Sequence, residues 1–358
     1  MKGQAVAIML VIVCGVAIHV MFGATLDALR QTRVRYYQEY RFADVFAALK
    51  RAPESLRERI AALPGVAEVE TRVVADVHLD VAGFAEPITG RLISIPDNRE
   101  PRLNRLYLRQ GRLPAADRDD EVVVSEAFAE AHRLEPGAKL RVVINGRRQA
   151  LTLVGTALSP EYIHQLRPGS MFPDYQRYGV LWMGRRALGI AYGMEGAFND
   201  VVVGLTNPRA APDVIDELDR LLTPYGGLGA HDREDQPSHR FLSEEFRNIT
   251  LSATLFPVLF LGVAVFLLNV VMNRLIGMQR EQIGTLKAFG YGNSAIALHY
   301  LKLVLIVVLV GVLVGVGGGA WLGRRLAELY TTFFRFPFLD YRLTFQLVLG
   351  ATLLNLGG

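Results

Sequence analysis

Three long stretches of the chain contain no lysine, arginine, aspartate or glutamate, and they constrain the fold more than any other feature. They cover residues 3–26, 248–273 and 303–323. A helix that crosses the hydrocarbon core of a bilayer needs about 20 predominantly apolar residues. Each stretch meets this requirement, so the sequence predicts membrane-spanning helices over 3–26, 248–273 and 296–323.

The first stretch is longer than the apolar core of a cleaved secretory signal, which has about 7–15 residues. No convincing cleavage site follows it. We therefore predict a retained transmembrane helix, with a cleaved signal as the alternative. His19 lies within this stretch, and a lone histidine near the end of a span is most often interfacial.

Composition narrows the possible functions. The chain has 358 residues, is 51% hydrophobic and carries a formal net charge of +4. The basic residues are spread along the chain without interleaved aromatic residues, which argues against nucleic-acid binding. The only cysteine is Cys14, so no disulfide can form within the chain. The polar region 27–247 must therefore rely on its own core.

The region 27–247 has the patterns of an α+β domain. A helix over 27–41 is expected to continue from the first span, and an amphipathic helix over 53–63 starts at a proline. Strands are predicted over 66–81, 88–95, 121–124, 179–183 and 200–205, and helices over 125–132, with Ser125 as its cap, and 208–222. Asn145-Gly146 between strands over 139–144 and 147–154 is a strong hairpin signal. We expect two lobes, of which one is mostly β.

Two segments combine histidines with carboxylates. His164 with Glu161 and Asp174 lies in a loop over 159–178 that is rich in proline and aromatic residues. A polar linker over 225–240 contains the second group, which consists of His231, Asp232, Glu234, Asp235 and His239. Neither spacing matches a metal-ligand pattern, so we predict no metal site and no cofactor.

The third predicted span has a glycine at every fourth position: Gly311, Gly315, Gly319 and Gly323. Residues spaced by four lie on one stripe of a helix, and small residues there let a second helix approach closely. The sequence therefore predicts a helix-packing face. The alternative is that glycine is simply common in membrane helices.

The segment 274–294 is polar and lies between two predicted spans, so it must be at one face of the membrane. Its pattern predicts a short helix that is part apolar and part charged and that ends at glycines: Ile283, Leu286 and Phe289 are apolar, Arg280, Glu281 and Lys287 are charged, and Gly290 and Gly292 follow. Such a helix suits docking into a groove of a soluble partner. The alternative is an ordinary basic loop that orients the spans.

Residues 280–290, REQIGTLKAFG, resemble the R-x-E-I-G-x-L-K-A-x-G-type signature of FtsX-like (MacB-type) ABC transporter permeases, although here the arginine and the glutamate are adjacent. The order of a span, a large domain and further spans also resembles this family. The resemblance implies that this segment contacts an ABC ATPase subunit. The candidate coupling residues are then Arg280, Glu281, Ile283, Gly284, Leu286, Lys287, Ala288 and Gly290.

The resemblance also implies the fold class and topology, because the basic residues are too evenly distributed to decide the orientation. The expected fold combines membrane α-helical spans with an α+β extracytoplasmic domain, a MacB-like periplasmic core with two lobes. Region 27–247 and a loop over 324–343 would lie outside the cytoplasm, and the coupling segment 274–294 inside it. Residues 344–358 would begin a fourth span that is too short, which suggests an incomplete chain.

The expected function is that of a plasma-membrane permease subunit. The sequence has no G-x-x-x-x-G-K-[ST] loop and no other catalytic motif, so we expect no enzyme activity in this chain. A separate ATPase would move the outer domain to export or extract a lipid, lipoprotein, peptide or drug. Further expected partners are a second permease copy or half, a periplasmic adaptor protein and membrane lipids. The alternative is a membrane-anchored sensor or regulatory scaffold whose outer domain binds a ligand or activates a wall hydrolase.

Overall fold

The computed structural model describes residues 2–342 except positions 82, 85, 87, 168 and 171. The chain divides into two compact units. One, the helical unit, consists of Met1–Thr32, Glu244–Thr332 and Leu339–Gly358, and the other, the β-rich unit, consists of Arg33–Ser243 and Phe333–Phe338. The predicted start of a fourth span at 344–358 lies outside the described residues.

Among the residues that the structure describes, three helices are long and apolar enough to cross a membrane: α1 (Lys2–Glu39), α6 (Pro237–Met278) and α8 (Asn293–Phe333). They extend beyond the uncharged stretches. Helix α8 continues to Phe333, so the prediction of a loop over all of 324–343 is wrong for its first part. The cause is local, because Glu328 pairs with both Arg324 and Arg325 at helical spacing, and such pairs support a helix.

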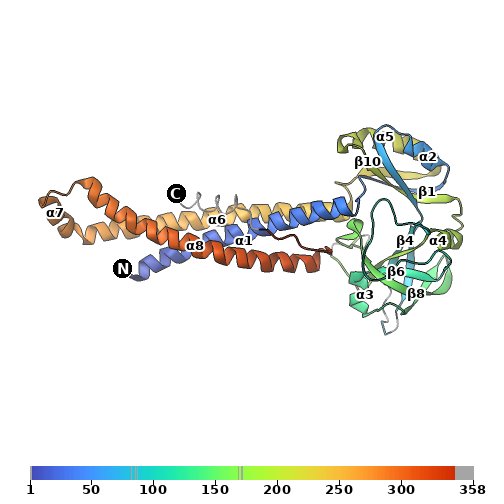
Figure 1. Cartoon of the computed structure of the whole chain (residues 1–358), viewed down its shortest axis with the longest axis horizontal. Coiled ribbons are helices and arrows are strands. Elements are labelled where there is room, and N and C mark those ends of the chain that lie inside the picture. The colour runs from blue at the N-terminus through green and yellow to red at the C-terminus, as the bar shows by residue number, and fades with distance from the viewer. Residues whose placement is uncertain are drawn as a thin grey trace. The chain divides into compact units, whose positions relative to one another are not determined.

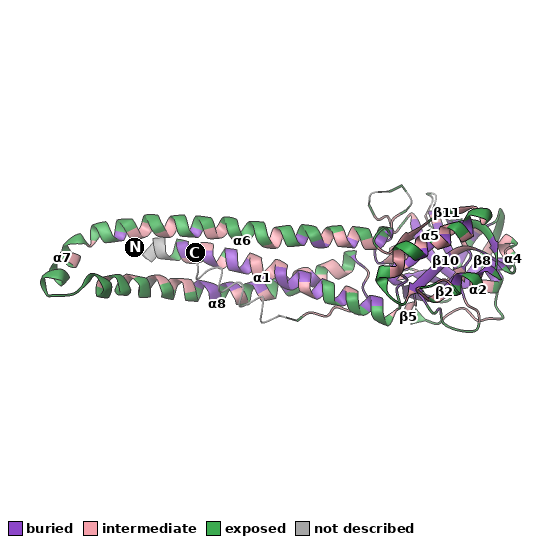
Figure 2. Cartoon of the chain, turned by 90° about the horizontal axis from the view of Figure 1, so that it is seen from above, coloured by how far each residue is buried: buried purple, intermediate pink, exposed green. Residues whose placement is uncertain are grey.

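The core of the helical unit lies along one face of α1. Apolar side chains from three helices meet there, namely Ile8, Ile12, Val16 and Val20 of α1, Ala264 of α6 and Val312 of α8. The opposite faces of α6 and α8 are exposed over most of their length (Figure 2). They present large apolar side chains such as Phe266 and Leu313, which are 67% and 73% exposed. Such continuous apolar surface is typical of contact with lipid or with other helices.

His19 has a specific partner within the helical unit. Its Nδ1 lies 3.1 Å from the backbone oxygen of Ala253 in α6. Pro257 follows four residues later in the same helix, and proline has no N–H to donate to that oxygen. The ring N–H of His19 therefore replaces the missing helical donor, with its proton on Nδ1, and ties α1 to α6 beside the proline.

The first lobe of the β-rich unit is an antiparallel sheet in the order β11 (Gly227–Asp232), β1 (Val45–Pro53), β10 (Ala197–Leu205) and β2 (Val66–Arg72). Helices α2 (Leu56–Ala61) and α5 (Ala211–Leu222) pack against this sheet (Figure 1). Val214, Leu218 and Leu222 recur at helical spacing and are buried. They join Leu56 and Ile60 of α2 in the core of this lobe.

The second lobe is a mixed sheet in the order β5 (Tyr107–Gly111), β8 (Arg147–Leu158), β6 (Glu121–Ser125), β9 (Tyr178–Gly184), β4 (Ile88–Ile95), β3 (Val74–Asp80) and β7 (Lys139–Ile144). Strand β7 also pairs with β8, so the sheet closes into a barrel. The predicted hairpin is confirmed, since Ile144 faces Arg147 and Asn145 and Gly146 both have the positive φ of a type I′ turn.

Several sequence-based boundaries are wrong. The strand expected over 66–81 is two strands interrupted at Val73, because β2 belongs to the first lobe and β3 to the second. The helix expected from Pro53 starts at Leu56, since Pro53 ends β1. Ser125 does precede α3 (Glu126–His132), but its side chain does not cap that helix. Its Oγ instead accepts a hydrogen bond from the backbone N–H of Val180 at 3.4 Å.

Other elements were not predicted. Strands β1 and β5 and helix α4 (Arg185–Tyr192) are absent from the sequence-based assignment, and β11 lies in the segment that was interpreted as a polar linker. The sequence of β11, GLGAHD, has two glycines and no alternating apolar pattern. Pairing with β1 over Val45–Leu49 holds it in the sheet. A tertiary contact of this kind overrides local propensity.

Candidate functional site

The segment between α6 and α8 contains helix α7 (Arg280–Ala288), which forms the corner between these two helices (Figure 1). Gln279 separates it from α6, and Gly290 ends it with a left-handed φ of 91°. The Gly290 N–H donates to the Lys287 oxygen at 3.0 Å and the Tyr291 N–H to the Leu286 oxygen at 3.1 Å. A glycine at this position satisfies carbonyls that the end of a helix leaves free.

Among the predicted coupling residues, Ile283 is half-buried and all the others are exposed. The side chains of Arg280, Glu281 and Lys287 have no ion pair within the described part of the chain. A Cβ placed on Gly284 would meet nothing within 4 Å. The helix therefore offers free charges and an open backbone surface to a partner.

Exposed apolar side chains surround α7. Met278, Leu286, Phe289 and Tyr291 are 65%, 41%, 78% and 57% exposed. Leu286 and Phe289 are among the apolar positions expected for this helix, whereas Met278 and Tyr291 were not singled out from the sequence. Their position at the ends of a charged helix gives the corner an apolar surface, of the kind that marks a protein-contact site.

A hydrogen bond between α8 and Gln279 supports the corner, and the sequence did not indicate it. The hydroxyl of Tyr300 in α8 donates to Oε1 of Gln279 at 2.5 Å, so α8 supports the start of α7. A groove of about 400 Å³ lies beside it, with Leu286, Tyr291, His299 and Lys302 among its lining residues. A long-range pair such as Gln279 and Tyr300 leaves no local pattern in the sequence.

The four glycines of α8 face α1. A Cβ built on Gly311 would lie 2.9 Å from Ile12, and one on Gly315 would lie 2.7 Å from Val16. On Gly319 it would lie 2.6 Å from the backbone oxygen of Ala17. A Cβ on Gly323 would lie 3.0 Å from the backbone oxygen of Met21. The two helices approach as closely as small residues allow, and the importance of this stripe for assembly stays a prediction.

We expect Gly319→Leu to destabilise the helical unit by about 1–3 kcal/mol, the usual cost of overpacking. The side chain would meet backbone atoms of Ala17, which cannot rotate away. Gly318→Leu is the matched control, since a Cβ there meets nothing within 4 Å. The measurement is the thermal unfolding temperature of each purified full-length variant in detergent. Equal temperatures for the two variants would contradict a packing role.

Four of the residues that invited a metal interpretation have other partners. Glu161 accepts two hydrogen bonds from Arg72, and Asp174 pairs with Arg177. His239 Nδ1 lies 3.0 Å from the Tyr37 hydroxyl, and His231 stacks on Phe46. No group of three or more possible metal ligands occurs within residues 2–342 as described.

A buried charge cluster connects the two lobes of the β-rich unit. Arg72, at the end of β2, donates to Glu161 at 2.6 and 3.0 Å and to Asp200 of β10 at 2.7 Å. Asn104 Nδ2 donates to the same Glu161 at 2.8 Å. Burial raises the pKa of Asp200, and the nearby Arg72 opposes that rise. Nothing in the local sequence pattern indicated this cluster.

Residues 333–338, which begin at the last residue of α8, pack into the β-rich unit. The Arg335 guanidinium pairs with Glu130 at 2.6 Å. The backbone N–H of Arg335 donates to the backbone oxygen of Ile163 at 3.0 Å. Phe334 and Phe336 are buried. Both polar and apolar contacts hold this segment, which we call the strap, within the β-rich unit.

Comparisons with known proteins give two family matches. A MacB-like periplasmic core domain matches residues 5–221, and an FtsX-like permease C-terminal region matches residues 254–356. The chain is similar to the extracellular domain of the noncanonic ABC-type transporter YknZ from Gram-positive bacteria, at 14% identity and a TM-score of 0.35, over 53% of this chain and 98% of that one. It is also similar to the periplasmic region of MacB from Actinobacillus actinomycetemcomitans, at 13% identity and a TM-score of 0.36, over 60% of this chain and 98% of that one. No curated protein gave a significant match.

Proposed function

The chain belongs to the FtsX-like permeases with a MacB-like periplasmic core domain, and from this premise we propose that it couples ATP hydrolysis by a separate ABC ATPase to movement of its β-rich unit. Permeases of this family are inner-membrane proteins with a periplasmic domain. They act with an ABC ATPase and are generally not catalytic themselves. The β-rich unit is then the periplasmic domain, with the expected α+β content.

The observation that carries the coupling proposal is the exposed surface of α7. This helix combines charges that have no partner in the described chain with exposed apolar residues at its ends. Leaving Phe289 78% exposed gains nothing for a monomer, whereas a partner surface would bury it. We therefore assign to α7 the role of docking into the ATPase, with Arg280, Glu281 and Lys287 as its polar contacts.

An uninterrupted helix connects α7 to the strap, which supports transmission of movement from α7 to the β-rich unit. Helix α8 begins five residues after α7 ends and runs without interruption over Asn293–Phe333. Its last residue begins the strap in the β-rich unit. A hydrogen-bonded helix transmits displacement along its axis, so motion of α7 would reach the strap. A second permease copy or half would match the second site of an ATPase dimer, and the cargo would be a lipid, lipoprotein, peptide or drug.

We expect the double variant Glu281→Lys and Gly284→Trp to lose the ATPase subunit in a pull-down of the permease from membranes. Recovery should fall at least tenfold, because the variant reverses one contact charge and adds bulk to the docking face. The fold should survive, since both positions are exposed and a Cβ on Gly284 meets nothing within 4 Å. The measurement is the amount of ATPase recovered per permease.

A matched control makes the same chemical changes elsewhere. Glu58→Lys alters an exposed residue of α2, and Gly262→Trp adds bulk at an open position of α6. This control should retain the ATPase. Loss of ATPase from both variants would assign the effect to general damage. Failure to recover any ATPase with the unmodified protein would favour a membrane-anchored sensor or scaffold instead.

A further inference from the structure

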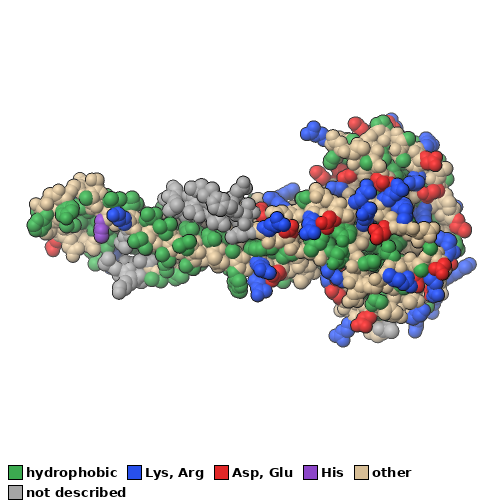
Figure 3. All heavy atoms as spheres, in the orientation of Figure 1, with side chains coloured by type: hydrophobic (Ala, Val, Ile, Leu, Met, Phe, Trp, Pro, Cys, Tyr) green, Lys and Arg blue, Asp and Glu red, His purple; other side chains and the backbone are tan. Residues whose placement is uncertain are grey.

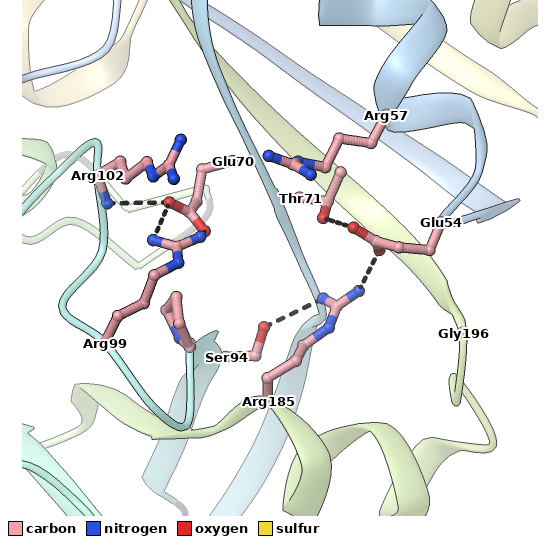
Figure 4. Close-up of a pocket in the computed structure, with 10 residues that line it drawn as sticks. Glu54, Arg57, Glu70, Thr71, Ser94, Arg99, Arg102, Arg185 and Gly196 are labelled. Carbon is pink, nitrogen blue, oxygen red and sulfur yellow. Dashed lines mark hydrogen bonds and ion pairs between the residues drawn. The ribbon is translucent and has the colours of Figure 1, made fainter.

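A polar pocket of about 450 Å³ lies at the junction of the two lobes of the β-rich unit (Figure 4). The first lobe contributes residues from the end of β1, from α2 and from β2, and the second contributes residues from the end of β4, the loop after it and the start of α4. The pocket belongs to neither the α7 corner nor the helical unit. Charged side chains also cover much of this unit's visible surface (Figure 3), so the distinctive feature of the pocket is its imbalance of charge.

Four arginines and two glutamates line the pocket, which leaves a formal charge of +2. Glu70 is engaged by Arg99 at 2.7 and 3.1 Å and by the backbone N–H of Arg102 at 2.9 Å. Glu54 accepts from Arg185 at 3.1 Å and from the Thr71 hydroxyl at 2.6 Å. The acidic groups are therefore committed to existing partners. Arg102 also pairs with Glu68, which lies outside the lining, at 3.0 Å, so one positive charge of the lining is left without an acidic partner.

Arg57 supplies the uncommitted charge. Its side chain extends from α2 toward Thr71 in the pocket (Figure 4). It is half-buried, and its guanidinium has no hydrogen bond or ion pair within the described residues. The guanidinium nitrogens of Arg57 are not among the buried polar atoms that lack a partner in the described structure, so they are open to solvent in the pocket and accessible to a ligand. An incoming anion would supply the missing acceptors.

Two neighbouring groups are also able to donate. Burial lowers the pKa of the Arg185 guanidinium, and Glu54, Asp97 and Glu70 oppose this only in part, so an anion in the pocket would stabilise its charged form. Ser94 is buried, and its Oγ accepts from the Val73 N–H at 2.8 Å and from Arg185 at 3.3 Å. With both acceptor positions occupied, its hydroxyl proton is available, and no acceptor for it is present among the described residues.

We propose that this pocket binds a phosphoryl group, carried by a small phosphate ester or by a lipid headgroup, through Arg57 and Arg185 with Ser94 as a further donor. A phosphoryl group has several acceptor oxygens and one to two negative charges, which suit two arginines from different lobes and a lining in which one positive charge has no acidic partner. A single carboxylate offers only two acceptor oxygens, which is fewer than the three groups that converge as donors, Arg57, Arg185 and Ser94. The site does not depend on the proposed coupling through α7.

The position of the pocket gives binding a mechanical consequence. Arg57 is in the first lobe and Arg185 in the second, so one phosphoryl group that contacts both would connect the lobes. A ligand that binds only the native arrangement stabilises it by mass action. Occupation of this site should therefore raise the thermal unfolding temperature of the β-rich unit.

The test is calorimetric titration of the full-length chain in a neutral, phosphate-free detergent. The probes are inorganic phosphate, glycerol phosphate and a short-chain phosphatidic acid, each at constant ionic strength, with acetate as the reference anion. The unmodified chain should bind at least one phosphorylated probe more tightly than acetate. Arg57→Gln should weaken that binding at least tenfold, the loss expected for a charge-assisted hydrogen bond.

Arg57 is the suitable residue to change because its guanidinium has no hydrogen bond or ion pair in the described structure. Arg59→Gln on the exposed face of the same helix is the matched control and should bind normally. Tighter binding of the phosphatidic acid than of glycerol phosphate assigns the site to a lipid headgroup, and equal binding assigns it to a soluble ester. The proposal is overturned if no phosphorylated probe binds, if acetate binds equally well, or if Arg57→Gln binds like the unmodified chain.

Discussion

Arg72→Met is expected to lower the free energy of unfolding of the β-rich unit by about 3–5 kcal/mol, the cost of removing one partner from a buried ion pair. Arg72 is 7% exposed, and its guanidinium holds both Glu161 and Asp200. Methionine fills similar space but donates nothing, so two buried carboxylates lose their common cation. Because Glu161 and Asp200 belong to different lobes, their repulsion would also act across the junction.

The measurement is denaturant unfolding of the full-length chain in detergent, followed by the fluorescence of Trp182. This tryptophan is buried in β9, and Trp321→Phe removes the other one. Arg118→Met is the matched control, since the pair of Arg118 with Asp120 is solvent-exposed and should contribute little to stability. A similar small loss for Arg72→Met would show that the cluster does not hold the lobes together.

The parts of the fold that the sequence predicted are those encoded locally. An uncharged stretch long enough to span a bilayer needs no partner to be recognised, and the hairpin follows from Asn145 and Gly146 alone. The junction of the lobes is different. Arg72, Glu161 and Asp200 come from three distant segments, and only the sheet pairing of β2 with β10 brings two of them together.

The same distinction explains the candidate sites. Helix α7 was predicted because its apolar and charged positions recur within one short segment, and its signature is local too. The phosphoryl pocket was missed because Arg57, Ser94 and Arg185 lie on three elements that the tertiary fold assembles. The glycine stripe of α8 was predictable only in part. Its spacing is visible in the sequence, whereas its partner α1 is not.

Acid is expected to destabilise the β-rich unit as the pH falls from about 6.5 to about 4, through His164. Its ring stacks on Phe241 with centroids 3.9 Å apart and also lies beside Phe334 of the strap. Both ring nitrogens are buried, and neither has a hydrogen-bond partner in the described structure. Burial therefore lowers the pKa of His164 from 6.5 to about 4.

Stability falls with falling pH because the unfolded chain binds the proton of His164 before the folded chain does. Above pH 6.5 the imidazole is neutral in both the folded and the unfolded chain, and the full stability is present. As the pH falls, the unfolded chain takes up the proton near 6.5, while the folded chain resists until about 4. Stability is lost across this window, with a ceiling of about 3 kcal/mol. Below the lower value, both states are protonated and the loss is complete.

His164→Phe should remove this contribution while keeping the aromatic stack with Phe241 and Phe334. We expect its free energy of unfolding, relative to the unmodified chain, to rise by about 2–3 kcal/mol between pH 7 and pH 4.5. Other titrating groups cancel in that difference, and the matched control is His78→Gln, at an exposed position of β3. Parallel pH profiles for His164→Phe and the unmodified chain would mean that the folded protein accommodates a charged imidazole beside the strap. Burial would then not keep this ring neutral.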